Sequence, residues 1–159
     1  PGAQVGGHFV LETATGPLDT STLDTDLMRI YFGYTYCPDV CPTELARMAQ
    51  IYEGLDYDKM RVSGLFVTVD PERDTIDAVT EYAEIFDSSF RGLAGDRTQI
   101  EAVMRQYRVY AQKVGDDPAT YTVDHSSRIY LMNQDAKLMA LFSMDTEIPM
   151  MIEKVKTFL

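Results

Sequence analysis

The chain has 159 residues, of which 45% are hydrophobic and 25% are charged, a composition typical of a folded globular domain and not of a disordered chain. Its length predicts one domain over residues 1–159 with a sizeable core. The formal net charge is −11, from 14 Lys and Arg against 25 Asp and Glu, which argues against nucleic acid or anionic lipid as a general partner. No apolar run approaches the roughly 18 residues of a membrane helix. Because the first residue is Pro1, we interpret the chain as a processed or truncated piece, in which any upstream segment, including a membrane anchor, would not be visible.

Hydrophobic periodicity predicts strands alternating with helices. The expected elements, in chain order, are strands at 8–13 and 29–34, a helix at 43–55, a strand at 62–69, helices at 74–86 and 98–107, a short strand at 110–114, a hairpin of strands at 128–133 and 137–142, and a helix at 147–159. Asp74 is the expected N-cap of the second helix. A β–α–β opening followed by a β–β–α ending resembles the thioredoxin-like arrangement of α/β proteins, here with an N-terminal β extension.

The only two cysteines, Cys37 and Cys41, share one short segment, FGYTYCPDVCP at residues 32–42. Such a pair favours redox or metal chemistry over a structural disulfide framework. The segment lies where a predicted strand gives way to a helix, the edge at which open α/β sheets bind ligands. Pro42 fits the first turn of that helix, with Asp39 as a candidate N-cap. We therefore expect the helix N-terminus to favour the thiolate form and so to lower a thiol pKa.

Cysteines four residues apart in a helix have Cα atoms about 6 Å apart, close enough for a disulfide or for one soft metal ion between two thiolates. Thiolates favour Cu(I) or Zn(II), and two sulfurs leave room for a third ligand. The chain has two histidines. His125 lies in a predicted polar loop, residues 121–127, which the topology brings close to the first helix. His8 lies in a strand pattern near the chain start, and no comparable argument brings it close to the cysteines.

Three segments together resemble the SCO/SenC family of copper-binding proteins, which assist the assembly of cytochrome c oxidase. They are FGYTYCPDVCP at residues 32–42, VDPERDT at 69–75 and YTVDHS at 121–126. With the hairpin that follows, the resemblance spans about residues 33–142, most of the chain.

The resemblance implies a thioredoxin-like fold with a hairpin inserted before His125, and one copper ion, Cu(I) or Cu(II), bound by Cys37, Cys41 and His125. It implies a copper metallochaperone that delivers copper to the binuclear copper site in a subunit of cytochrome c oxidase or, alternatively, a thiol–disulfide oxidoreductase that reduces the cysteines of that subunit. Other copper chaperones or thiol reductants are further expected partners. Family members usually carry an N-terminal membrane anchor. We therefore expect a location on the periplasmic side of a bacterial inner membrane or, alternatively, in the mitochondrial intermembrane space.

Three carboxylates are candidates for a place beside the metal ligands. The resemblance suggests that the loop carrying Asp70 and Asp74 lies near the metal, where a carboxylate could support a ligand. Asp124 directly precedes His125 and could orient its ring. The structural alternative is that Pro71 makes a turn and Asp74 caps a helix.

Two other functions are open at this stage. Cys37 and Cys41 could act as the redox-active pair of a thiol–disulfide oxidoreductase, with His125 tuning a thiol, although their spacing is not that of a Cys-x-x-Cys motif. A peroxidase would use Thr35 and Arg128 beside the reactive cysteine. Thr35 is only two residues before Cys37, and a peroxidase leaves His125 unexplained.

Overall fold

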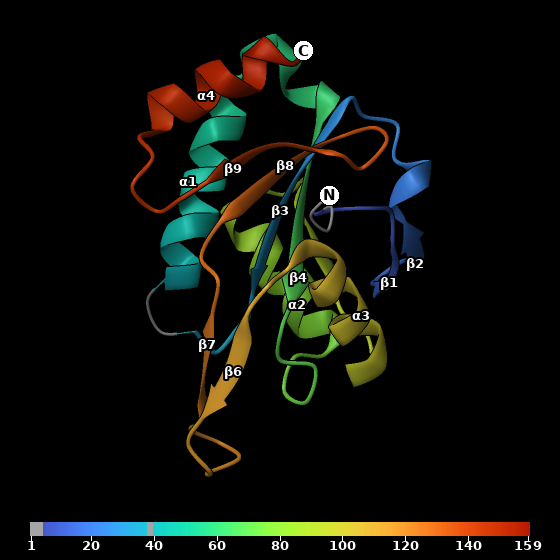
Figure 1. Ribbon diagram of the computed structural model, residues 1–159, viewed down its shortest axis with the longest axis vertical. Coiled ribbons are helices and arrows are strands. Elements are labelled where there is room, and N and C mark those ends of the chain that lie inside the picture. Colours follow the sequence, from blue (N-terminus) through green and yellow to red (C-terminus); the bar gives the residue numbers. More distant parts are fainter. Residues whose placement is uncertain (1–4, 38–39) are drawn as a thin grey trace.

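The computed structural model describes residues 5–37 and 40–159, apart from the side chains of Val40, Tyr57 and Lys59. Asp39, the expected N-cap, lies outside these residues. The elements in chain order are β1 (Val10–Thr13), β2 (Gly16–Asp19), η1 (Thr20–Thr22), β3 (Leu27–Gly33), α1 (Val40–Gly54), η2 (Asp56–Arg61), β4 (Val62–Thr68), α2 (Ile76–Phe86), β5 (Arg91–Leu93), α3 (Arg97–Tyr107), β6 (Ala111–Val114), β7 (Thr122–His125), β8 (Ile129–Asn133), β9 (Leu138–Phe142) and α4 (Ile148–Thr157) (Figure 1).

A five-stranded sheet in the order β5-β4-β3-β8-β9 forms the centre of the molecule. Strands β3, β4 and β5 run parallel, while β8 pairs antiparallel with both β3 and β9. All seven residues of β3 are buried, because the strand is central and covered on both faces. This coverage explains why the sequence of β3 reads as an almost continuous apolar run.

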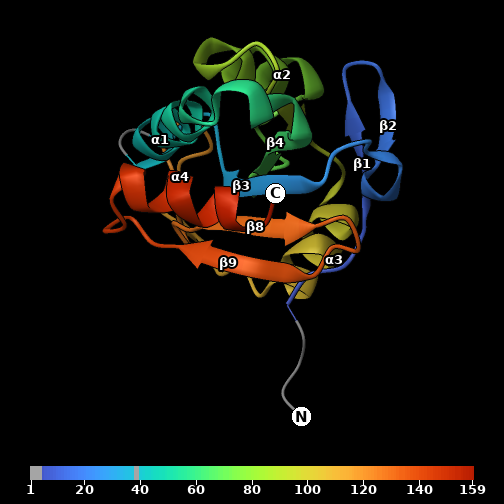
Figure 2. The same cartoon turned by 90° about the horizontal axis from the view of Figure 1, so that it is seen from above.

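Helices cover both faces of this sheet (Figure 2). On one face, the buried Arg29 of β3 donates a hydrogen bond to the carbonyl oxygen of Met48 in α1. Helices α2 and α4 lie on the same side as α1. On the other face, the ring of Phe32 packs against Tyr107 of α3, with 5.5 Å between the ring centroids. Arg29 and Phe32, three residues apart on β3, therefore point to opposite faces of the sheet, as the two-residue period of a strand requires.

Two small hairpins extend the fold. The β1–β2 hairpin is the predicted N-terminal β extension, and it joins the main sheet through a bridge between Glu12 and Ala94, just after β5. The β6–β7 hairpin projects beyond the carboxyl end of β3 and β4 (Figure 1). His125 is the last residue of β7. This hairpin therefore carries His125 to the end of the sheet where the cysteine segment begins.

The structure confirms the order of the predicted elements, adds strands β2 and β5, which the sequence analysis did not predict, and corrects two local assignments. Residues 122–125 form strand β7 and not a polar loop, because they pair with β6. Helix α2 begins at Ile76, and its N-cap is Thr75, whose side chain accepts a hydrogen bond from the backbone N–H of Ala78 at 3.1 Å. The Asp74 carboxylate makes tertiary hydrogen bonds instead. Among the described residues, no helix has the length and apolar character needed to span a bilayer.

Candidate metal centre

The cysteine segment links the end of β3 to the start of α1. Cys41 is the second residue of α1 and so lies in its first turn, as predicted. Cys37 lies just ahead, and its backbone N–H donates to the carbonyl oxygen of Tyr34 at 3.2 Å. The backbone N–H of Cys41 donates to Sγ of Cys37 at 3.4 Å. The N-terminus of α1 thus directs one of its unshared N–H groups at a cysteine sulfur.

His125 approaches the same point from the β6–β7 hairpin. Its Nε2 atom lies 3.3 Å from Sγ of Cys41. Its Nδ1 atom lies 2.9 Å from the carbonyl oxygen of Ser126. A carbonyl oxygen only accepts hydrogen bonds, so Nδ1 carries the proton in the neutral ring and Nε2 presents its lone pair to the cysteines. A backbone carbonyl on the second ring nitrogen is a common way to orient a metal-binding histidine.

The three side chains form a group that could hold a metal ion. The sulfur atoms of Cys37 and Cys41 and a ring nitrogen of His125 all lie within 4.8 Å of one another. Cys41 is fully buried, Cys37 is 9% exposed, and His125 is partly exposed. Two thiolates and one imidazole are soft or intermediate ligands, a set suited to Cu(I) and acceptable to Zn(II). The chemistry of the donors therefore fits the copper ion that the sequence resemblance implies.

The electrostatics of Cys41 differ from the sequence expectation. The helix N-terminus was expected to lower a thiol pKa, but the hydrogen bond with Cys37 and burial raise the pKa of Cys41 far above its usual range. A buried thiol beside a second sulfur keeps its proton because a second negative charge in this small space is unfavourable. Metal binding at this group therefore has to release a proton from Cys41.

Aromatic residues of β3 and the following turn enclose the site. The hydroxyl of Tyr31 donates to Sγ of Cys41 at 3.8 Å. The rings of Tyr31 and Tyr34 meet the ring of His125 edge to face, with centroids 6.1 Å and 5.6 Å away. Both tyrosines are buried. They leave the histidine little freedom to turn away from the cysteines.

Gly33 is a site residue that the sequence argument did not single out. A Cβ atom at this position would lie 2.7 Å from Sγ of Cys41 and 2.9 Å from the ring of Tyr31. Only a residue without a side chain leaves space for the Cys41 thiol against the strand. The signal in the sequence is a glycine at the end of an otherwise apolar strand, which often marks close approach of another group.

Asp74 lies beside the start of the cysteine turn and binds Thr35. Its carboxylate accepts hydrogen bonds from the backbone N–H of Thr35 at 3.0 Å, from the hydroxyl of Thr35 at 2.5 Å and from the hydroxyl of Thr68 at 2.6 Å. Burial is the main cause that raises the pKa of this carboxyl. Asp74 therefore ties the start of the turn before Cys37 to the end of β4.

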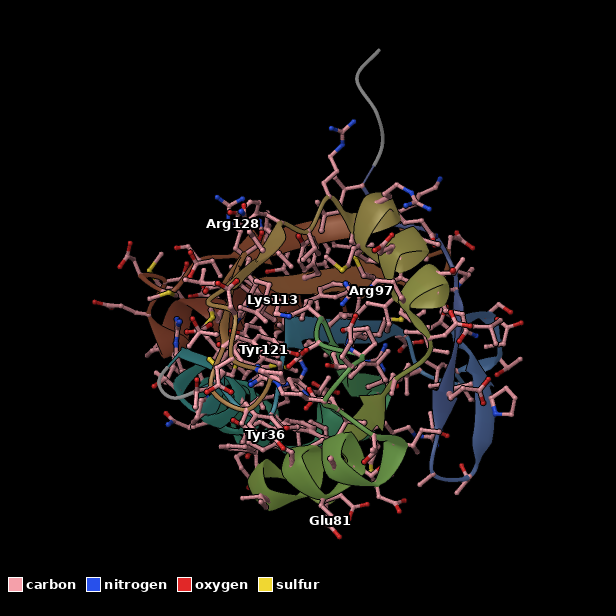
Figure 3. The ribbon with its side chains drawn as sticks, turned by 90° about the horizontal axis from the view of Figure 1, so that it is seen from below. Tyr36, Glu81, Arg97, Lys113, Tyr121 and Arg128 are labelled. Atoms are coloured by element: carbon pink, nitrogen blue, oxygen red, sulfur yellow. The ribbon has the colours of Figure 1, made fainter. Side chains whose placement is uncertain are left out.

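Asp70 connects the loop after β4 to the hairpin that carries His125. It accepts hydrogen bonds from the hydroxyl of Tyr121 at 2.5 Å and from Nε of Arg73 at 2.7 Å. The Arg73 guanidinium also lies over the rings of Tyr121 and Tyr36, at 3.5 Å and 4.5 Å from their centroids. Figure 3 shows Tyr36 and Tyr121 at this end of the molecule, with Lys113 beside Tyr121. Asp70 is thus placed to anchor the hairpin that carries His125.

Other residues named from the sequence lie elsewhere. The side chain of Asp124 is exposed, and neighbouring residues of a strand point to opposite faces, so it is directed away from the His125 side of β7. The Thr35 hydroxyl donates to Asp74, and Arg128 is exposed. His8 lies near the chain start, where its Nδ1 atom is 2.9 Å from the Thr20 hydroxyl. The geometry therefore brings none of these four side chains to the Cys37–Cys41–His125 group.

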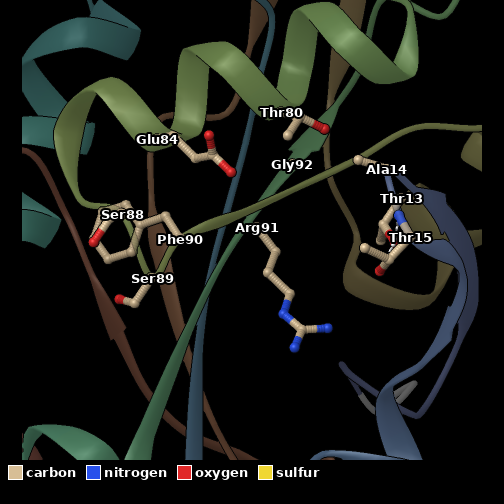
Figure 4. Close-up of a pocket in the computed structure, with 10 residues that line it drawn as sticks. All are labelled: Thr13, Ala14, Thr15, Thr80, Glu84, Ser88, Ser89, Phe90, Arg91 and Gly92. Carbon is tan, nitrogen blue, oxygen red and sulfur yellow. Dashed lines mark hydrogen bonds between the residues drawn. The ribbon is translucent and has the colours of Figure 1, made fainter.

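A cavity of about 420 Å³ lies between the turn after β1 and the carboxyl end of α2 (Figure 4). Thr13, Thr80, Glu84 and Arg91 are among its lining residues. None of the three candidate ligands lines it, so it is separate from the candidate metal centre.

Comparison with known proteins places this geometry in a family. The sequence profile of the SCO1/SenC family matches residues 1–159. The chain belongs to this family. It is 38% identical over 153 residues to an SCO2-like protein of Rickettsia conorii, covering 94% of this chain and 75% of the relative. It is 39% identical over 145 residues to the human mitochondrial SCO1 homolog, covering 87% of this chain and 47% of the human protein.

Solved structures of SCO proteins superimpose closely on this fold. Copper-bound ScoI of Bradyrhizobium japonicum matches with a TM-score of 0.87 and 36% identity, covering 98% of this chain and 99% of that one. Copper-bound ScoI of Arabidopsis thaliana matches with the same TM-score of 0.87 and 31% identity, covering 96% of this chain and 99% of that one. The fold is therefore the thioredoxin-like α/β fold of these proteins, as the order of elements predicted.

Proposed function

We propose that this SCO1/SenC protein binds one copper ion through Cys37, Cys41 and His125. The observation that carries the proposal is the convergence of two sulfurs and one histidine nitrogen within 4.8 Å, from two segments 84 residues apart in sequence. Related proteins of the same fold have been solved with copper bound, which supports copper as the ion. The ion is cargo here, since the proposal gives the protein no reaction to catalyse.

The architecture of the site suits transfer of the ion. Cys41 and Tyr31 form the buried floor, whereas Cys37 and His125 lie closer to solvent. An accepting cysteine or histidine of a partner would therefore displace His125 or Cys37 first, with Cys41 as the last ligand to leave. We propose the copper-site subunit of cytochrome c oxidase as the acceptor, on the basis of the family resemblance. A membrane-anchored location, in the periplasm or the mitochondrial intermembrane space, belongs to the same proposal.

Titration with Cu(I) tests the binding step. The reduced protein is titrated anaerobically against a competing Cu(I) chelator, in parallel with His125→Ala and Cys41→Ser. We expect one tight equivalent for the unsubstituted chain, clearly weaker binding for His125→Ala, and the largest loss for Cys41→Ser. His8→Ala is the matched control, because His8 is the only other histidine and lies outside the group. Tight binding that is indifferent to His125 would contradict the three-ligand site.

A thiol–disulfide oxidoreductase is the second candidate, because the sulfurs of Cys37 and Cys41 lie within 4.8 Å of one another and because disulfide exchange needs no metal. The two functions differ in their need for His125. Reduction of a disulfide in a model substrate by the dithiol form would continue in His125→Ala at a changed rate, because His125 only tunes a thiol, whereas copper transfer would be lost. Reduction at a useful rate together with no tight copper binding would favour this second function.

A further inference from the structure

Tyr34, at the start of the cysteine turn, contacts both halves of the candidate metal centre. Its backbone carbonyl accepts the N–H of Cys37 at 3.2 Å. Its ring meets the ring of His125 edge to face at 5.6 Å, with an angle of 84° between the ring planes. Its hydroxyl accepts a hydrogen bond from the backbone N–H of Val123 at 3.0 Å. One residue thus touches a cysteine, the histidine and the strand that carries the histidine.

The bond to Val123 is well placed to fix His125. Val123 lies two residues before His125 in β7, so both residues share one face of a short strand. Tyr34 is 2% exposed and Val123 is 8% exposed, so their hydrogen bond is shielded from water. A buried backbone N–H that loses its partner is unfavourable, and this cost holds the strand to the tyrosine.

The rest of the hairpin is held less firmly. Residues 112–120, which form most of β6 and the connection to β7, are all exposed. Besides the Tyr34 bond, the Asp70–Tyr121 bond holds the residue just before β7, and the backbone N–H of Ser126, just after β7, donates to the carbonyl oxygen of Tyr110. The Tyr34 hydroxyl therefore links the backbone of the hairpin directly to the cysteine turn.

We propose that the Tyr34 hydroxyl is a positioning group that holds His125 against the cysteines before the metal arrives. This inference rests on the proposed copper function and deepens it. Without the hydroxyl, the ring still packs, but β7 gains freedom, and His125 is directed at Cys41 for a smaller fraction of the time. Copper binding then has to order the hairpin, which weakens the apparent affinity.

A double-mutant cycle tests the proposal. Tyr34→Phe removes one oxygen and keeps the ring. We expect it to weaken Cu(I) affinity about three- to tenfold, the ratio that corresponds to one ordinary hydrogen bond. In a His125→Ala background the same substitution should change the affinity by less than about twofold, because its effect runs through His125. Equal weakening in both backgrounds, or no weakening in either, would overturn the proposal.

Two further measurements keep the result interpretable. Tyr130→Phe removes another buried hydroxyl, which donates to the carbonyl oxygen of Tyr107 in α3 at 3.0 Å and not to the hairpin strand β7. It should lower stability and leave Cu(I) affinity unchanged. In the metal-free protein, hydrogen exchange at the Val123 amide should be faster in Tyr34→Phe than in the unsubstituted chain. If the unsubstituted chain binds no copper, the proposed copper function is wrong, but the exchange measurement still tests the hydrogen bond between Tyr34 and Val123. Exchange at Val123 that is the same in both proteins would show that this bond does not hold β7.

Discussion

Gly33 of β3 and Cys41 of α1 meet so closely that a Cβ atom on Gly33 would lie 2.7 Å from the Cys41 sulfur. The strand and the helix are joined by only six residues, and the thiol packs onto the bare backbone at the end of the strand. This contact sets the depth at which Cys41 lies. The close packing of α1 against the end of β3 therefore determines the position of a proposed metal ligand.

Gly33→Ala should impair copper binding through this contact. The added methyl has to displace the sulfur of Cys41 or the rings of Tyr31 and Phe66, which lie 2.9 Å and 3.1 Å from its position. Overpacking of this kind destabilises a core by roughly 1–3 kcal/mol. We expect Cu(I) affinity to fall at least about tenfold, measured by chelator competition.

Gly64→Ala is the matched control for this prediction. Gly64 lies in β4, the strand next to β3, and its added Cβ would lie 2.6 Å from the ring of Phe90 and 3.3 Å from Nη2 of Arg29. It should destabilise the fold in chemical denaturation to a similar degree and leave Cu(I) affinity unchanged. A loss of affinity as large as that of Gly33→Ala would mean that general destabilisation, and not displacement of Cys41, weakens binding.

The two cysteines should differ in reactivity in the reduced, metal-free protein. Cys41 is fully buried and has a raised thiol pKa, whereas Cys37 is 9% exposed and its sulfur accepts the N–H of Cys41. Because thiolate and access together determine alkylation, iodoacetamide at neutral pH should modify Cys37 first. Peptide mass spectrometry after short labelling measures the ratio. Preferential labelling of Cys41 would contradict the assignment of Cys41 to the buried floor of the site.

Substitutions at Asp70 and Tyr121 should lower the free energy of unfolding by different amounts. Asp70→Ala leaves the largely buried Arg73 without its carboxylate partner, and breaking such a pair costs on the order of 3–5 kcal/mol. Tyr121→Phe removes one hydrogen bond and should cost only about 0.5–1.5 kcal/mol. Urea unfolding measures both. Equal costs would show that the Arg73 pair contributes nothing beyond the Tyr121 bond.

The sequence was sufficient for the order of elements because that information is local. The helical spacing of apolar residues in α1 and the apolar run of β4 depend on neighbours a few residues away, and both elements formed as predicted. The placement of Cys41 in the first turn of α1 follows from the same local signals. The convergence of His125 with the cysteines was expected from topology and family resemblance, and the structure brings the three side chains together.

What the sequence could not decide depends on contacts between distant residues. Asp74 and Thr75 are both suitable helix caps, and the choice falls to Thr75 because Thr35 and Thr68 occupy the Asp74 carboxylate. Residues 122–125 are a strand only because β6 pairs with them. The raised pKa of Cys41 results from its neighbour and its burial, which outweigh the expected effect of the helix N-terminus. In each case a tertiary contact overrides a local preference.

Tyr121 should make the hairpin sensitive to alkaline pH. Burial and its hydrogen bond to the Asp70 carboxylate raise the pKa of Tyr121 to about 12, from the ordinary value of 10.0. The unfolded chain therefore loses this proton near pH 10, while the folded protein keeps it until about pH 12. A raised acid pKa in the folded state contributes stability below pH 10 that is lost between pH 10 and 12.

The comparison of the unsubstituted chain with Tyr121→Phe isolates this contribution from the other tyrosines. Urea unfolding at pH 8, 10 and 11 should show that the stability advantage of the unsubstituted chain over Tyr121→Phe shrinks as the pH rises above 10. The ionised phenolate would also face the negative charge of Asp70, so the hairpin should loosen in the same range. A stability difference that stays constant from pH 8 to 11 would show that Tyr121 does not donate its proton to Asp70.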